Sequence, residues 1–208
     1  MNLDKLTSHI QREKYGDFWL TEAVRPGLEL TVTPTEGYRC EQYDDEQHDL
    51  HVPVLAAAVS RERLFDVFLS LLEPLGGVVD VMLETSHHDE AGRHRDIHRE
   101  YIDLSVLTSH LCDFEDLLLH DGCTGVAVIS RDQPIEVQFD EHKVLLVYAQ
   151  DLAPFEEVLR EAGIARNDGL KVITEGTHLH NTDPRHLPAF EQLCYRLGVG
   201  EAIERVSW

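Results

Sequence analysis

Basic residues are scarce in this sequence. Of its 208 residues, 18 are Lys or Arg and 39 are Asp or Glu, which gives a formal net charge of −21 at pH 7. A charge of this size repels phosphate backbones and anionic lipid surfaces at long range, so we expect neither nucleic-acid nor membrane binding. The charge favours solubility and can attract cations or a basic protein partner.

Long apolar segments and paired cysteines are also lacking. The longest apolar run, at residues 52–59, is far shorter than the roughly 18 residues that cross a membrane. The N-terminal stretch contains no apolar signal-peptide core. The cysteines stand at positions 40, 112, 123 and 194, with no CxxC pair and no zinc-ribbon spacing. We therefore expect a cytoplasmic protein with reduced, mostly structural thiols.

No motif of a common catalytic site is found. The sequence has no GxSxG or SxxK segment and no P-loop, and the glycines of "LEPLGG" lack both the P-loop lysine and the GxGxxG spacing. Acidic turns occur at "YDDEQH" and "FDEH", but neither has the EF-hand pattern of a calcium loop. The absence of these motifs favours a non-enzymatic protein, and the hydrophobic content of 42% predicts a compact globular fold.

A repeated pattern organises the chain. The pentapeptide "LTSHI" at residues 6–10 returns as "LTSHL" at 107–111, and each copy is followed by an Asp-Phe pair, a glycine break and a β-rich segment, "LELTVTP" or "TGVAVIS". Each half then continues with an acidic turn, an apolar strand, an amphipathic helix and a strand that ends in Glu, two small residues and His. We interpret this order as an internal duplication of an α-β-β-β-α-β unit.

The repeat predicts the domain organisation and the fold class. The first α+β copy spans residues 1–90, a polar segment at 91–104 is a linker or a polar helix, and the second copy spans 105–208 and ends in an additional helix after Asp183. We expect an α+β protein whose copies pack about a pseudo-two-fold axis, either as two lobes or with one continuous sheet. The element order resembles that of the type III secretion chaperone fold, and a ferredoxin-like sandwich differs from it by one element.

Histidine is unusually frequent, with 13 residues that cluster in several short segments. In "EGTHLH", His178 and His180 point to the same face of a strand because side chains alternate. Glu175 can add an oxygen ligand to this pair if the strand bends. Imidazoles in such an arrangement bind zinc, copper or nickel. The sequence does not identify a further ligand for this site.

The duplication relates these residues to a second set. Glu84 and His87 end the last strand of the first copy as Glu175 and His178 end that of the second, so a pseudo-two-fold axis can bring all four into one shared metal site. The alternative is that the histidines are solvated side chains of an acidic surface, and that equivalent residues merely finish equivalent strands.

Two functional hypotheses fit these features. The first is a non-enzymatic binding or adaptor protein that needs no cofactor and contacts a protein partner, or a second copy of itself, through the surface or cleft between its halves. The second is a metal-dependent hydrolase or metal-binding protein, which holds a divalent transition metal such as zinc with these histidines and glutamates.

Overall fold

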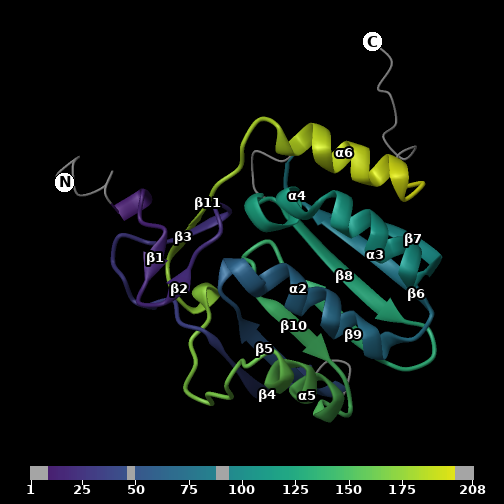
Figure 1. The fold of residues 1–208 in the computed structure, drawn as a ribbon, viewed down its shortest axis with the longest axis horizontal. Coiled ribbons are helices and arrows are strands. Elements are labelled where there is room, and N and C mark those ends of the chain that lie inside the picture. The colour runs from purple at the N-terminus through teal and green to yellow at the C-terminus, as the bar shows by residue number, and fades with distance from the viewer. Residues whose placement is uncertain (1–8, 46–49, 88–93, 200–208) are drawn as a thin grey trace.

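The computed structural model describes residues 9–45, 50–87 and 94–199. A seven-stranded sheet forms its centre, and each neighbouring pair of strands is antiparallel (Figure 1). From one edge to the other, the strands are β4 (Gly37–Asp45), β5 (Leu50–Ala58), β10 (Leu145–Tyr148), β9 (Glu136–Phe139), β8 (Thr124–Ser130), β6 (Val78–Thr85) and β7 (Arg95–Asp103). Strands of both predicted copies pair with each other, so the two halves share one continuous sheet rather than forming two lobes.

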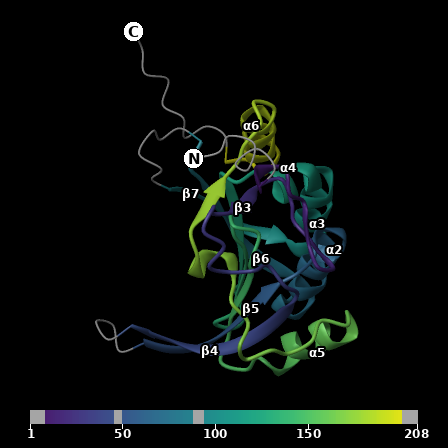
Figure 2. The same ribbon diagram turned by 90° about the vertical axis from the view of Figure 1, so that its left-hand side faces the viewer.

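Helices cover one face of this sheet. They are α2 (Arg61–Leu72), continued by the short η1 (Glu73–Leu75), α3 (Leu104–Asp113), α4 (Glu115–His120) and α5 (Ala153–Glu161). Figure 2 shows α2, α3 and α5 on the same side of the strands. Their apolar stripes form the main core, where the fully buried ring of Phe68 in α2 packs on Phe139 of β9 with 5.1 Å between centroids. Burial under these helices explains the apolar inward positions of the strands.

The opposite face is partly covered by the chain that follows α5. This segment contains η2 (Ile173–Glu175) and β11 (His178–His180), and β11 pairs with β3 (Val24–Pro26) in a ribbon separate from the main sheet. Leu170 and Val172 pack on Ala56 and Val144 of the sheet in a second, smaller core. The N-terminal strands β1 (Lys14–Tyr15) and β2 (Phe18–Trp19) form one more hairpin. The β3–β11 ribbon therefore joins the N-terminal segment to the end of the chain.

The α+β class is confirmed, but two expected strands are missing. Residues 28–34 form bends and irregular chain. At the start of β4, the chain after α5 makes an isolated bridge instead, in which Tyr38 N donates to the oxygen of Ala165 and Asn167 N donates to the oxygen of Tyr38. The strand expected at residues 170–175 is replaced by η2, in which backbone N–H groups bond back to carbonyls three residues earlier. The six-element order is thus incomplete in both halves of the described chain.

Residues 95–103, inside the segment predicted to be a linker or a polar helix, form the edge strand β7. Ile97 and Ile102 are its buried residues, and its pairing with β6 is shifted by a bulge between Val79 and Val81. The bulge explains why the two isoleucines do not follow the two-residue period of a strand. The exposed charges of β7 suit an edge, since they oppose pairing with another chain.

The additional C-terminal helix, α6 (His186–Arg196), is present and begins just after the predicted start. Asp183 precedes it, and its carboxylate accepts a hydrogen bond from the backbone N–H of Arg185. The side chains of Phe190, Leu193 and Cys194 are buried, as the helical spacing predicts. Among the described residues, none of the helices combines the length and the apolar composition of a membrane span.

Candidate metal centre

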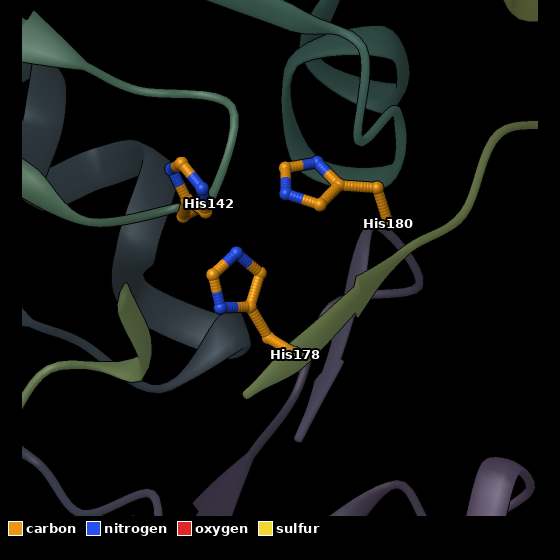
Figure 3. A group of neighbouring side chains, drawn as sticks. All are labelled: His142, His178 and His180. Atoms are coloured by element: carbon orange, nitrogen blue, oxygen red, sulfur yellow. The ribbon is translucent and has the colours of Figure 1, made fainter. Parts of the chain in front are cut away.

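Three histidines from two separate parts of the chain converge beside the end of the sheet (Figure 3). His178 and His180 belong to β11, where alternation directs both side chains to one side and leaves Leu179 between them 44% exposed. His142 belongs to the turn between β9 and β10. The ring centroids lie 4.7 to 5.2 Å apart, and one nitrogen of each ring lies within 4.8 Å of the other two.

Hydrogen bonds on the outer side of each ring determine which nitrogen is free. Nδ1 of His142 lies 3.0 Å from a carboxylate oxygen of Asp140, Nδ1 of His178 lies 2.9 Å from the oxygen of Gly176, and Nδ1 of His180 lies 2.6 Å from the oxygen of Gly122. Because these oxygens only accept, each Nδ1 carries the proton and donates it. Each Nε2 therefore carries no proton and presents a lone pair. Metal-binding histidines share this arrangement, in which the outer hydrogen bond fixes the tautomer.

The β9–β10 turn holds His142 in place. The carboxylate of Asp140 accepts a hydrogen bond from Val144 N at 2.8 Å, and its main-chain oxygen accepts one from Lys143 N at 3.0 Å. Lys143 adopts a φ of 64°, which is uncommon for a residue other than glycine. Its buried amine donates to the oxygen of Thr124 at 2.9 Å and so ties the turn to β8. Burial lowers the pKa of Lys143 to about 8.

Acidic neighbours give this corner a negative potential. Burial by itself would lower the pKa of His142, but the hydrogen bond to Asp140 and the charges of Asp140 and Glu141 outweigh it, and the pKa of His142 is raised. A proton on the imidazole and a metal ion are both cations, so the same carboxylates stabilise either of them. The electrostatics of the turn therefore suit a bound cation.

The centre borders a groove of about 290 Å³ on the face of the sheet away from the helices. His142 and Asp140 stand on its wall, and Arg39, Tyr43 and Tyr148 contribute to the rest of the lining. The groove lies over β4, β5 and β10, where strands of the two halves meet. A smaller apolar cavity of about 40 Å³ also borders His142. A small molecule in the groove can therefore contact His142, the one of the three histidines that lines it.

Glu175, which the sequence suggested as an oxygen ligand, does not join the three histidines. It lies in η2, where its carboxylate contacts Arg39 at 2.7 Å and accepts a hydrogen bond from Val172 N at 2.8 Å. Burial raises the pKa of Glu175, but the bonds from Arg39 and Val172 outweigh it and the net shift is downward. The carboxylate of Glu175 thus holds η2 against β4.

His87 belongs to a different group, with Asp121 and Cys123. Its Nε2 lies 2.7 Å from the carboxylate of Asp121, which also accepts hydrogen bonds from the hydroxyl of Thr124 and from Cys123 N. Asp121 is 0% exposed. Burial raises its pKa, but the hydrogen bonds from His87, Thr124 and Thr182 outweigh it and lower the pKa of Asp121 to about 2. This group is a buried hydrogen-bond network centred on the Asp121 carboxylate.

The shared site expected from the duplication is thus divided. His87 and His178 take part in separate groups. The two groups are neighbours, because the oxygen of Gly122, next to Asp121, accepts the hydrogen bond from Nδ1 of His180. Glu84 is half-buried on β6, and its pKa is raised by burial first and then by the charge of Asp96 on β7. It lies beside Gly125 of β8, outside both groups.

His142 is the member of this histidine group that the sequence did not reveal. It stands in the segment "FDEH", which the pattern identified only as an acidic turn, and the whole of α5 separates it from β11. Its position beside Asp140 is the one local signal, since a carboxylate two residues before a histidine can accept its Nδ1 proton.

No protein-family model matches the chain, no curated protein matches its sequence, and no solved structure matches its fold. The site is therefore interpreted from its own geometry.

Proposed function

We propose that this protein binds a divalent transition metal, such as zinc, through His142, His178 and His180. The observation that carries the proposal is the convergence of three imidazoles whose Nδ1 protons are all donated outward. Zinc sites that retain an open position commonly use three protein ligands of this kind. Histidines that are merely solvated on an acidic surface have no reason to share one tautomer and one focus.

The spacing of the rings suits an ion after a small closure. Zinc–nitrogen bonds of about 2.0–2.1 Å place the nitrogens of a tetrahedral site about 3.4 Å apart. The three candidate nitrogens already lie within 4.8 Å of one another. Rotations of side chains at a partly exposed site are sufficient for the remaining approach.

The test is metal content and affinity of protein purified without a histidine tag. We expect one zinc per chain by elemental analysis and by calorimetric titration, and loss of this binding in His142→Ala, His178→Ala and His180→Ala. His98→Ala, which changes an exposed histidine of β7, is the matched control and keeps full binding. A wild-type protein that takes up no zinc, nickel or copper would refute the proposal.

A metal-dependent hydrolase is the second candidate, and the groove beside His142 favours it. A metal ion that keeps a position open can bind a water molecule and lower its pKa, which generates a nucleophile near neutral pH. The reconstituted protein is then expected to cleave p-nitrophenyl acetate or bis(p-nitrophenyl) phosphate faster than its metal-free form. Equal rates with and without metal, or a rate unchanged in His142→Ala, would remove this candidate.

The adaptor function uses the same groove, which lies where the two halves meet. The two functions differ in whether they require a metal ion. An adaptor binds its protein partner equally well in the metal-free form. The internal duplication also stays a prediction, as does kinship with the secretion chaperone or ferredoxin-like folds. The duplication is supported by one order of elements, two antiparallel strands followed by a helix, which occurs as β4, β5, α2 and again as β9, β10, α5.

A further inference from the structure

Glu141 has a mostly buried side chain, and its carboxylate has no hydrogen-bond donor among the residues that the structure describes. The residue is 8% exposed, and within the described chain its carboxylate makes contacts with two histidine rings but accepts no hydrogen bond. The buried amine of Lys143 donates to the oxygen of Thr124, and the described residues show no ion pair between it and Glu141, although the charges of the two groups attract each other at longer range. A mostly buried anion without donors is stabilised by a cation placed next to it.

The carboxylate is directed at the metal centre. Its Oε1 lies 3.9 Å from Nε2 of His142, and the same oxygen lies 3.4 Å from Nε2 of His94. Since Nδ1 of His142 donates to Asp140, Nε2 and Oε1 face each other as two acceptors. A proton or a metal ion between these two acceptors would relieve their mutual repulsion. Glu141 is within 4 Å of His142 alone among the three histidines and lies outside the 4.8 Å group, so a shared ion requires its side chain to move toward His178 and His180.

We propose that Glu141 is the fourth ligand of the metal centre, with one carboxylate oxygen bound to the ion and His94 hydrogen-bonded to the carboxylate from outside. This inference rests on the proposed metal-binding function. It brings the start of β7 into the site, because His94 immediately precedes that strand. Ligating carboxylates are commonly oriented by such outer hydrogen bonds.

The donor set of three imidazoles and one carboxylate defines the class of metal. Imidazoles suit zinc, copper, iron and nickel, and a carboxylate extends the range toward manganese and iron. Four protein ligands complete the tetrahedron of zinc. A metal that prefers five or six ligands, such as Mn²⁺ or Fe²⁺, retains open positions for further ligands. The fourth ligand therefore decides whether the centre is closed or can bind a small molecule.

The test is titration of the full chain with Co²⁺, whose visible absorption reports the number and type of ligands. Glu141→Gln preserves the size of the side chain and Glu141→Asp preserves the charge but shortens the reach. We expect both variants to lose at least about tenfold in Co²⁺ affinity and to change the spectrum. Glu136→Gln, a half-buried glutamate of β9 outside the centre, is the matched control and leaves both unchanged.

The outcomes separate this inference from the proposed function. Wild-type protein that binds neither Co²⁺ nor zinc refutes the metal function itself. Wild-type affinity and spectrum in Glu141→Gln, with binding lost in His142→Ala, refutes only the role of Glu141. Full affinity in Glu141→Asp would mean that the carboxylate acts through its charge and not as a ligand, which also overturns the inference.

An infrared measurement on wild-type protein covers the case in which the Glu141 variants do not fold. Addition of zinc is expected to shift one carboxylate band, and this shift is expected to vanish in His142→Ala. A wild-type difference spectrum without a carboxylate shift contradicts ligation by Glu141.

Discussion

In the part of the chain that the structure describes, two groups of side chains bring metal-binding residue types together, and they differ in how their hydrogen bonds are used. In the centre formed by His142, His178 and His180, the hydrogen bonds lie on the outer side and the inner nitrogens have no donor. In the group of His87 and Asp121, the hydrogen bond joins the two candidate ligands to each other. The first arrangement leaves a place for a cation, whereas the second already has its internal partner.

Closeness of ligand residues is therefore not sufficient to identify a metal site. Both groups satisfy the same distance limit, but only the first has lone pairs that converge without a donor. In the second, the buried Asp121 carboxylate already accepts several hydrogen bonds, and the oxygen of the neighbouring Gly122 accepts one from Nδ1 of His180. We infer that the His87 network is structural and helps to position the centre next to it.

The largest expected difference between the two groups is in stability. Asp121→Ala removes a fully buried acceptor and leaves the donors of His87, Thr124 and Cys123 without a partner, so the free energy of unfolding should fall by about 3 kcal/mol or more. His142→Ala, in a partly exposed turn, should cost about 1 kcal/mol or less without metal. Urea unfolding of the metal-free variants measures both changes. Similar losses in the two variants would remove the distinction between a structural network and a metal centre.

The effect of zinc on the free energy of unfolding further distinguishes the two groups of side chains. With free zinc at about one hundred times its dissociation constant, the free energy of unfolding of the wild type should rise by about 2.7 kcal/mol. The same rise is expected in His87→Ala, despite its lower starting stability, and none is expected in His180→Ala. Denaturant titrations with and without zinc measure the effect. A zinc response that disappears in His87→Ala would assign the metal to the other group.

The next largest effect is expected in the stability of the protein at acid pH. The folded-state pKa of Asp121 is about 2, below its usual value, so its ionised form stabilises the folded chain above about pH 4. This contribution, about 2 kcal/mol, is lost as the pH falls from about 4 toward 2. The stability gap between wild type and Asp121→Asn is therefore expected to narrow over this interval in unfolding measurements. A gap that stays constant would show that the charge of Asp121 does not contribute.

Exchange of backbone amides with solvent is expected to show the smallest effect. The centre links β11, which pairs only with β3, to the β9–β10 turn of the main sheet. Zinc should therefore slow hydrogen exchange in β3 and β11 severalfold and leave α2 unchanged. The measurement is hydrogen–deuterium exchange by mass spectrometry, with His178→Ala as the control that shows no change on addition of zinc.

Part of the candidate site was predictable from the sequence because it depends on local geometry. His178 and His180 are two residues apart in a segment that forms a strand, and alternation alone places both on one side. The helices α2 and α5 were equally predictable from the spacing of their apolar residues. Glu175 was not, because a strand that turns into a 3-10 helix redirects its side chain toward Arg39.

The sequence by itself determined the mixed α+β composition, the acidic surface and the paired histidines of β11, since each follows from residue type or from periodicity over a few residues. The tertiary structure alone decided that β11 leaves the main sheet to pair with β3 and that the β9–β10 turn brings His142 opposite it. The physical reason is that these positions depend on hydrogen bonds between distant segments, such as those from Asn181 N to the oxygen of Ala23 and from Gly122 N to the oxygen of Asn181. No local pattern in the sequence contains these contacts.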